Sequence, residues 1–140
     1  MESVPLFLYP FFRNGGGEVY ENYNPNPIQN RVGDCAVRAI AKALDISWEM
    51  AFVKTAVNGF LMGDLQNSDL VWGAVLREEG FKRGEGCPDC ETVAEFAEAH
   101  PAGVFVLKTD GHVVAVVDGA YFDTWDSGDE PVIYYWYKEG

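Results

Sequence analysis

The chain has 140 residues, of which 48% are apolar and 14% aromatic, and its net charge is −12 from 22 acidic and 10 basic residues. This length suffices for one domain with a hydrophobic core but not comfortably for two. The acidic excess argues against binding to nucleic acid, because such binding needs a basic surface to neutralise phosphates. No apolar run reaches the roughly 20 residues of a membrane span, and three cysteines with no basic N-terminal leader favour a cytoplasmic protein. We therefore predict a single domain over residues 1–140, with neither a nucleic-acid nor a membrane partner.

The first part of the chain, residues 1–30, is predicted to form a strand and loop region. Its loops are the Gly-rich segment 13–18 and the Asn- and Pro-rich segment 22–30, because these residue types favour turns over regular structure. Residues 34–100 follow as a helical part, since apolar residues there recur with a helical period.

The first predicted helix begins after Asp34, which is the expected N-cap. Its apolar residues Val37, Ile40 and Leu44 recur at spacings of three and four, whereas Arg38 lies on another face. This pattern is typical of an amphipathic helix that packs on a core.

Three further helices are expected before the chain changes character. Ser47 is the expected N-cap of the second helix, and segment 67–80 forms the third, which ends at its glycine. The fourth begins near Thr92, whose spacing to Glu95 is that of a capping box, and ends at Pro101.

Residues 103–138 are rich in β-branched and aromatic residues, which favour strands. Breaks at Asp110–Gly111 and Asp118–Gly119 are typical of tight hairpin turns. We therefore predict an α+β fold in which the N-terminal helices pack on one face of a C-terminal antiparallel sheet.

The chain has only two histidines, so any cysteine–histidine chemistry must use His100 or His112. His100 is expected at the C-terminal end of the fourth helix, where a histidine interacts favourably with the helix dipole and has a structural role. His112 begins a predicted strand, so its side chain should project toward whatever covers that face of the sheet.

Cys35 lies at the start of the first predicted helix, directly after Gly33 and Asp34. The unpaired N–H groups and the positive dipole end of a helix favour a thiolate there. The same N–H groups can stabilise an oxyanion that forms on a substrate carbonyl. Taken by itself, the residue fits a small buried hydrophobe equally well.

The hairpin register selects a carboxylate partner for the histidine. If Asp118–Gly119 forms a two-residue turn, Asp123 lies on the same face of the sheet as His112, and Asp126 points away. A loop longer by one residue would reverse the choice between the two aspartates. Asp123 is the preferred residue for orienting the imidazole, and Asp126 is the alternative.

The order of these residues resembles that of the papain-like cysteine peptidases, in the compact forms of bacteria and phages. That family carries a glutamine six residues before the nucleophile, and here Gln29 stands six residues before Cys35. Its catalytic asparagine is followed by a tryptophan that shields the hydrogen bond to histidine, and the segment "DTW" over 123–125 resembles that element. The segments "GDCAVRAIAKAL" and "GHVVAVVDGAYFDTWD" are also similar to small phage and gut-bacterial proteins described as cysteine proteases.

The resemblance implies a papain-like fold and a peptide or protein substrate, with no cofactor and no metal. Cys35 would be the nucleophile, His112 the acid and base, Asp123 the group that orients it, and Gln29 part of the oxyanion hole. In the loop before the cysteine, Asn26 and Asn30 are the alternatives to Gln29. The expected reaction is amide hydrolysis through a thioester acyl-enzyme. The alternative function is that of an inactive, acidic papain-like protein of phage origin that binds and inhibits a host partner.

Cys87 and Cys90 form a single C-x-x-C segment. A zinc site would need two more ligands, and a redox disulfide would call for a thioredoxin-like βαβ context that the sequence does not indicate. The preferred interpretation is a plain loop that leads into the fourth helix.

Overall fold

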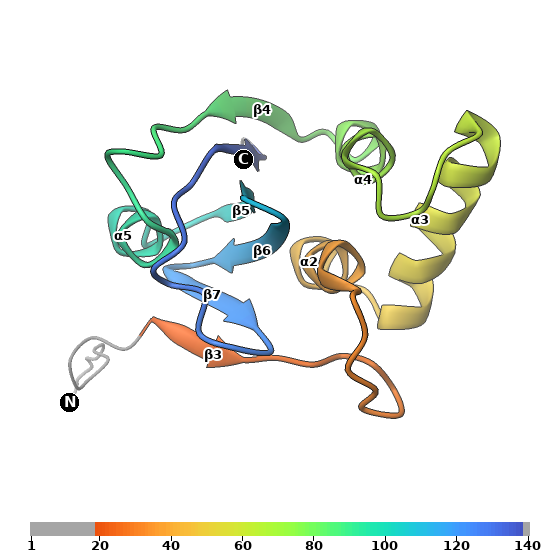
Figure 1. Cartoon of the computed structure of the whole chain (residues 1–140), viewed down its shortest axis with the longest axis horizontal. Helices are drawn as coiled ribbons and strands as arrows, with labels where there is room; N and C mark the ends of the chain where they lie inside the picture. Colours follow the sequence, from red (N-terminus) through yellow and green to blue (C-terminus); the bar gives the residue numbers. More distant parts are fainter. Residues whose placement is uncertain (1–18, 139–140) are drawn as a thin grey trace.

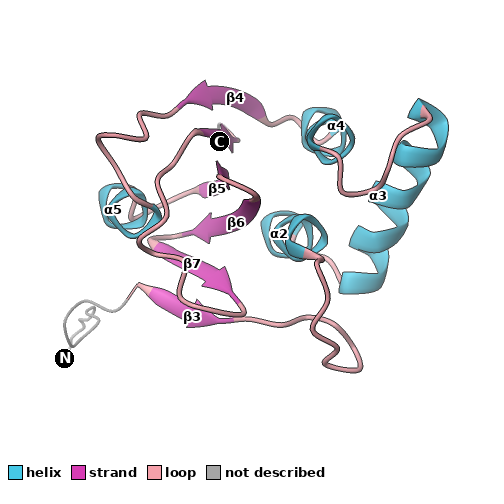
Figure 2. Cartoon of the chain, in the orientation of Figure 1, coloured by secondary structure: helices cyan, strands magenta, loops and turns pink. Residues whose placement is uncertain are grey.

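A computed structural model describes residues 19–138 of the chain, so residues 1–18 of the predicted strand and loop region lie outside the described part. Within residues 19–138, the helices and strands are arranged as one mixed sheet flanked by helices (Figures 1 and 2). The helices are α2 (Cys35–Leu44), α3 (Trp48–Met62), α4 (Asp69–Glu78) and α5 (Val93–Ala99). The strands are β3 (Tyr20–Asn22), β4 (Lys82–Glu85), β5 (Val104–Thr109), β6 (His112–Val117), β7 (Ala120–Asp123) and β8 (Tyr134–Tyr137). The predicted α+β class and the four predicted helices are confirmed.

The sheet has the strand order β3-β7-β6-β5-β8-β4. Its four C-terminal strands pair antiparallel, as predicted. The sheet extends beyond the predicted antiparallel region 103–138. The strand β3, which lies within the predicted N-terminal strand and loop region, pairs parallel with β7 at one edge, and β4, which lies within the predicted helical part, pairs antiparallel with β8 at the other. The short edge strand β4 escapes a pattern-based prediction because long-range backbone pairing, not an apolar alternation, holds it.

The two hairpins have the predicted two-residue turns. Thr109 pairs with His112 across Asp110–Gly111, and Val117 pairs with Ala120 across Asp118–Gly119. Both residues of the second turn have positive φ, 49° and 86°, which is the conformation that favours an Asp-Gly pair in a tight hairpin. The register prediction between β6 and β7 is therefore confirmed.

Helices cover both faces of the sheet, whereas one covered face was predicted. Helices α2, α3 and α4 lie on one side and α5 lies on the other (Figure 1). Along β6, Val113 and Ala115 join the core under α2, while Val114 and Val116 join the core under α5. The uninterrupted apolar run of β6 is the signature of a strand buried on both faces.

Helix α3 packs on its neighbours α2 and α4 through small residues. Its buried side is formed by Ala51, Thr55 and Gly59, whereas Phe60 and Leu61 are largely exposed. The predicted cap at its start is confirmed, since the Ser47 hydroxyl accepts a hydrogen bond from the backbone of the first turn. Among residues 19–138, no helix combines the length and the apolar character that crossing a bilayer requires.

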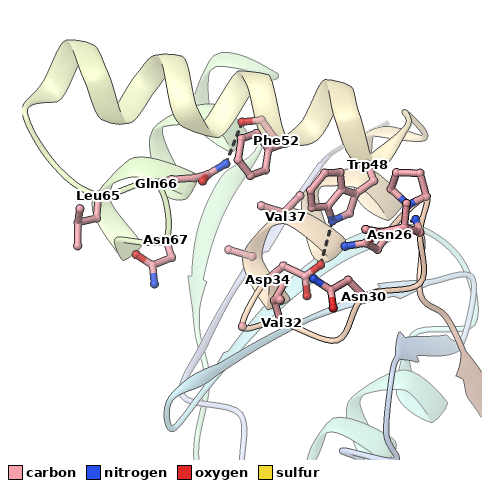
Figure 3. A pocket seen from close by; sticks show the side chains of 14 residues that line it. Asn26, Asn30, Val32, Asp34, Val37, Trp48, Phe52, Leu65, Gln66 and Asn67 are labelled. Carbon is pink, nitrogen blue, oxygen red and sulfur yellow. Dashed lines mark hydrogen bonds between the residues drawn. The ribbon is translucent and has the colours of Figure 1, made fainter.

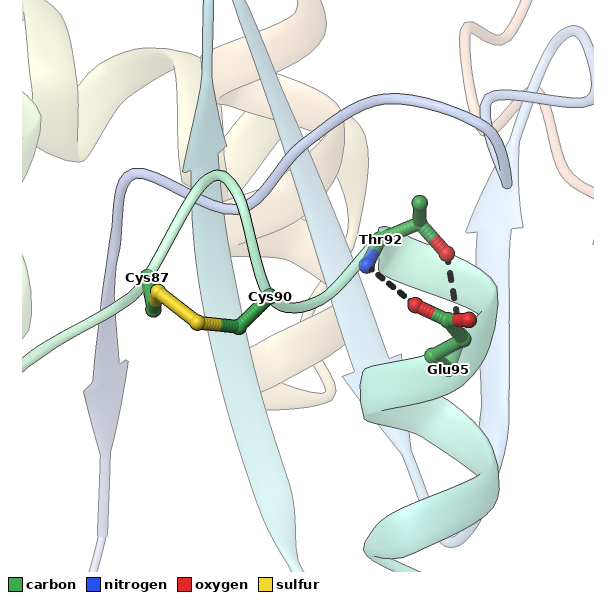
Figure 4. Close-up of a disulfide and its surroundings, with 4 residues drawn as sticks. All are labelled: Cys87, Cys90, Thr92 and Glu95. Atoms are coloured by element: carbon green, nitrogen blue, oxygen red, sulfur yellow. Dashed lines mark hydrogen bonds between the residues drawn. A yellow bond between two sulfur atoms is a disulfide. The ribbon is translucent and has the colours of Figure 1, made fainter.

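The loop between β4 and α5 contains a disulfide between Cys87 and Cys90 (Figure 4). The segment is a loop that leads into α5, as predicted, but its two cysteines are paired, because the short C-x-x-C spacing lets the exposed turn bring both sulfur atoms together. The predicted capping box follows directly, with Thr92 and Glu95 each accepting a hydrogen bond from the other's backbone N–H. Cys35 is consequently the only free thiol of the three cysteines.

Candidate active site

Three side chains from separate elements meet where α2 begins. Cys35 is the first residue of α2, His112 is the first of β6, and Asp123 is the last of β7. The packing of α2 across β6 brings the thiol to the imidazole, and the hairpin register brings the carboxylate to its other side. The prediction selected these three residues, and the structure places them in contact.

The imidazole of His112 faces both the thiol of Cys35 and the carboxylate of Asp123. Its Nε2 lies 2.6 Å from Oδ2 of Asp123. Because Nε2 is engaged with the carboxylate, Nδ1 is the ring nitrogen that is left to serve the sulfur. The imidazole and the backbone N–H of Val113 both act on the thiol and lower its pKa.

These contacts shift the pKa values of the thiol and the imidazole in opposite directions. Burial alone raises the pKa of Cys35, but the hydrogen bond and charge of His112, the Val113 N–H and the charge of Arg38 together lower it below its ordinary value. Burial lowers the pKa of His112, yet its bonds to Asp123 and Cys35 prevail and raise that pKa to about 9. The two shifts favour a thiolate beside a protonated imidazole at neutral pH.

Asp123 is buried and accepts hydrogen bonds on both carboxylate oxygens. Oδ2 accepts from His112 and from the hydroxyl of Ser127, each at 2.6 Å, and Oδ1 accepts from the Thr124 N–H at 2.8 Å and from Arg38 at 3.1 Å. Burial raises the pKa of Asp123, but its donors outweigh burial and lower the pKa below its ordinary value. The residue is therefore held as a carboxylate that fixes the orientation of the imidazole.

Sequence reasoning missed the polar network behind this carboxylate. The side chain of Arg38 is 8% exposed and donates to both Asp34 and Asp123. Asp34 also accepts a hydrogen bond of 2.9 Å from the indole of Trp48. Asp34 is the N-cap residue of α2, as predicted, but its carboxylate is engaged with these donors and forms no cap hydrogen bond. The signal in the sequence was the i,i+4 spacing of Asp34 and Arg38 on one helix face.

Trp125 covers the imidazole from the solvent side. Its ring centroid lies 5.0 Å from that of His112, and the residue remains partly exposed at 43%. This position agrees with the shielding tryptophan that the resemblance implies for the segment "DTW". Asp126, the alternative orienting residue, instead accepts hydrogen bonds from the Tyr121 hydroxyl and the Gly128 N–H.

Gln29 is placed away from the sulfur by its own hydrogen bonds. Its side-chain amide donates to the backbone carbonyls of Asn24 and Asn26, at 3.1 and 2.9 Å, and its backbone lies in the left-handed region with a φ of 58°. In the described structure, the Gln29 side chain therefore stabilises the loop before Cys35. Asn26 and Asn30 line a neighbouring cavity rather than the cleft around the thiol.

A cleft of about 310 Å³ opens above Cys35. Its walls come from the loop before α2, from the turn before β6 and from the segment after β7. They are formed by Arg31, Val32, Gly33, Cys35, Arg38, Gly111, His112, Thr124 and Trp125. Since Cys35 is the first helical residue, its backbone N–H has no partner within α2 and is available to an oxyanion in this cleft.

His100 lies elsewhere, at the C-terminal end of α5. Its Nδ1 is 2.7 Å from the carbonyl oxygen of Phe96, and its ring stacks on that residue at 3.9 Å between centroids. These contacts match the structural role predicted for it. In the part of the chain that the structure describes, no group of three or more His, Cys, Asp or Glu side chains is placed to hold a metal ion.

Comparison of the chain with protein-family models, with curated protein sequences and with solved structures finds no significant match. A thiolate activated by an imidazolium, which is itself oriented by a buried carboxylate, is equipped for nucleophilic attack and for proton transfer to a leaving group.

Proposed function

We propose that the protein is a papain-like cysteine peptidase that hydrolyses an amide bond of a peptide or protein substrate. The observation that carries this proposal is the juxtaposition of three side chains, in which His112 is hydrogen-bonded to Asp123 and lowers the pKa of the Cys35 thiol that shares its cleft. A buried cysteine with a purely structural role would need neither a charged imidazole nor a carboxylate behind it. The cost of burying these ionisable groups favours a chemical role.

The proposed reaction begins when the Cys35 thiolate attacks the carbonyl carbon of the scissile amide. The carbonyl oxygen becomes an oxyanion, which the backbone N–H of Cys35 stabilises. His112 then gives its proton to the leaving nitrogen, the C–N bond breaks, and the acyl group remains as a thioester on the sulfur. In the second step, water gives a proton to His112 and attacks the thioester, which releases the carboxylic acid and restores the thiolate–imidazolium pair.

The papain-like arrangement is part of the proposal. Its support is the order of the site along the chain, with the nucleophile opening the first described helix, the histidine on a later strand and the aspartate on the next. The contact between the rings of Trp125 and His112, whose centroids lie 5.0 Å apart, also supports it. The role of Gln29 in an oxyanion hole stays a prediction, because its amide would have to leave Asn24 and Asn26 to reach the cleft.

The test is a peptide-library digest that compares the protein with its Cys35→Ala variant. We expect cleavage products that depend on Cys35 and are lost in the variant. The chain offers a matched pair of histidine controls: His112→Ala should abolish cleavage, whereas His100→Ala should retain it, with folding checked by circular dichroism. Cleavage products that persist in Cys35→Ala would refute Cys35 as the nucleophile. A wild-type digest without cleavage products would refute the proposed peptidase activity.

The second function predicted from the sequence, binding and inhibition of a host partner by an inactive protein, uses the same scaffold. It is the weaker proposal, because an inhibitor has no need of the ordered pair formed by Cys35 and His112. Two results together would favour it: a pull-down from host lysate that returns a basic partner whose binding depends strongly on salt, and a peptide digest without cleavage products.

A further inference from the structure

Arg31 lies in the wall of the Cys35 cleft and, within residues 19–138, forms no ion pair. Most of the other basic side chains of this part of the chain have a carboxylate or an aromatic ring as partner. Those with a carboxylate are Arg38, Lys54, Arg83 and Lys108. Those over a ring are Lys42, Arg77 and Lys138. In a chain with 22 acidic and 10 basic residues, an arginine without an acidic partner is unexpected.

The guanidinium of Arg31 connects two walls of the cleft through one weak contact. It donates to the backbone carbonyl of Thr124 at 3.5 Å, and Thr124 belongs to the segment after β7 on the other wall. That distance is at the long limit for a hydrogen bond. A guanidinium has five N–H donors, and Arg31 is exposed, so it keeps donors for a bound molecule.

No acidic residue lines the cleft within the described part of the chain. The carboxylates behind its walls, those of Asp34 and Asp123, are buried and both accept hydrogen bonds from Arg38. The Asp34 carboxylate also accepts from the Trp48 indole in the neighbouring cavity (Figure 3). Neither carboxylate is left for Arg31, whose charge therefore stays without a counterion.

The groups that line the cleft favour an anion there, although the net charge of the chain is −12. Exposed charges more than about 8 Å apart are largely screened at physiological salt, so acidic residues elsewhere on the surface contribute little. Within the site, the thiolate of Cys35 offsets the imidazolium of His112, and the two aspartates offset Arg38. The guanidinium of Arg31 is the positive charge that remains.

We infer that Arg31 binds a carboxylate of the substrate, so that the substrate class is peptides with an acidic group close to the scissile bond. This inference rests on the proposed peptidase function. A planar guanidinium matches a carboxylate through two parallel hydrogen bonds, which a single ammonium cannot form. The carboxylate belongs either to an aspartate or glutamate side chain or to the C-terminus of the peptide.

The size of the cleft limits the position of this acidic group. A compact cavity of about 310 Å³ spans roughly 8 Å, which corresponds to about two or three residues of an extended peptide. Arg31 and Cys35 both line this cavity. The acidic group therefore lies within about three residues of the scissile bond.

The test uses alkylation of Cys35, which does not depend on turnover. Since Cys87 and Cys90 are joined in a disulfide, Cys35 is the free thiol that reacts when no reductant is present. The neutral reagent is iodoacetyl-Gly-Gln-amide. The acidic reagents are iodoacetyl-Gly-Glu-amide, with a side-chain carboxylate, and iodoacetyl-Gly-Gln, with a free terminal carboxylate. The measured quantity is the ratio of each acidic rate to the neutral rate, because a ratio cancels any change in thiolate reactivity.

We expect at least one acidic reagent to react about fivefold faster than the neutral reagent at low salt, which is the effect of an ion pair that water reaches. A faster reaction of the Glu reagent assigns a side-chain carboxylate as the ligand. A faster reaction of the reagent with a free terminus assigns the C-terminus of the peptide. Equal rates for all three reagents would overturn the inference.

Two matched variants locate the preference at Arg31. Arg31→Gln should bring the ratio close to one. Arg83→Gln removes the same charge from a side chain that is 47% exposed and does not line the cleft, so it should leave the ratio unchanged. Equal ratios in the two variants would overturn the inference. Because the readout is alkylation, a peptide digest without cleavage products would refute the peptidase activity without deciding this result.

Discussion

The strongest structural prediction concerns Arg38, which holds two buried carboxylates behind the site. Its side chain is 8% exposed, and those of Asp34 and Asp123 are 7% and 1% exposed. We expect Arg38→Met to preserve the apolar stem of the side chain while it removes the charge. The two carboxylates would then lose their shared guanidinium in a place that water reaches poorly.

The magnitude follows from the partners that remain. Removing one member of a buried ion pair costs about 3–5 kcal/mol in the free energy of unfolding. After the substitution, Asp123 keeps His112 and Ser127 as donors, and Asp34 keeps Trp48. The lower end of the range, about 3 kcal/mol, is therefore expected. For a chain of this length, that loss lowers the melting temperature by on the order of 10 °C.

The assay is urea unfolding followed by far-UV circular dichroism, with Arg83→Met as the control. Arg83 stacks on Tyr134 at 3.7 Å but has a side chain that is 47% exposed, so its replacement should cost less than about 1 kcal/mol. Arg38→Lys should fall between the wild type and Arg38→Met, because a single ammonium cannot reproduce the planar fork that reaches both carboxylates. Equal losses in Arg38→Met and Arg83→Met, or a more stable Arg38→Met, would refute the reasoning.

Two further predictions concern the ionisation of the site. Because the pKa of Cys35 is lowered from its ordinary value, iodoacetamide should modify Cys35 at a lower pH than it modifies an ordinary thiol. Because the pKa of His112 is raised to about 9, the kcat/KM for peptide cleavage should fall as pH rises through about 9, where the imidazolium loses its proton. Alkylation no faster than that of a model thiol at the same pH, or a kcat/KM that keeps rising beyond pH 10, would contradict the ion pair. Asp123→Asn should lower kcat/KM by at least about 10²-fold and bring the pKa of His112, followed by NMR, down toward its ordinary value. Asp126→Asn should change kcat/KM by no more than about threefold and should leave the pKa of His112 near its wild-type value. If Asp126→Asn instead had the larger effect of the two variants, the orienting role would belong to Asp126.

The local elements were predictable because each is decided within a few residues of the chain. The helix caps at Ser47 and Thr92 and the turns at Asp110–Gly111 and Asp118–Gly119 rest on short-range hydrogen bonds and on the freedom of glycine at positive φ. The turn at Asp118–Gly119 in turn determines the β6–β7 register, and the register brings Asp123 to His112. For this reason the choice between the two candidate aspartates was accessible to sequence reasoning.

The loop before the nucleophile was not predictable in the same way. The spacing of Gln29 to Cys35 is a property of the sequence, whereas the direction of its amide depends on competition among nearby carbonyls. In the structure, the carbonyls of Asn24 and Asn26 accept its hydrogen bonds. Similarly, the sequence does not state whether the thiols of Cys87 and Cys90 are paired, because that depends on how the turn closes.

By itself, the sequence determined where the helices and hairpins begin, and with them the position of Cys35 at a helix start and of His112 at a strand start. Only the tertiary structure decided that Arg38 is buried, that it joins Asp34 to an aspartate 85 positions further along the chain, and that helices cover both faces of the sheet. The physical reason is the distance along the chain between the residues that interact. Caps and turns are stabilised by neighbours in the chain, whereas a buried charge is stabilised by whichever partner the packing of α2 against β6 and β7 brings to it.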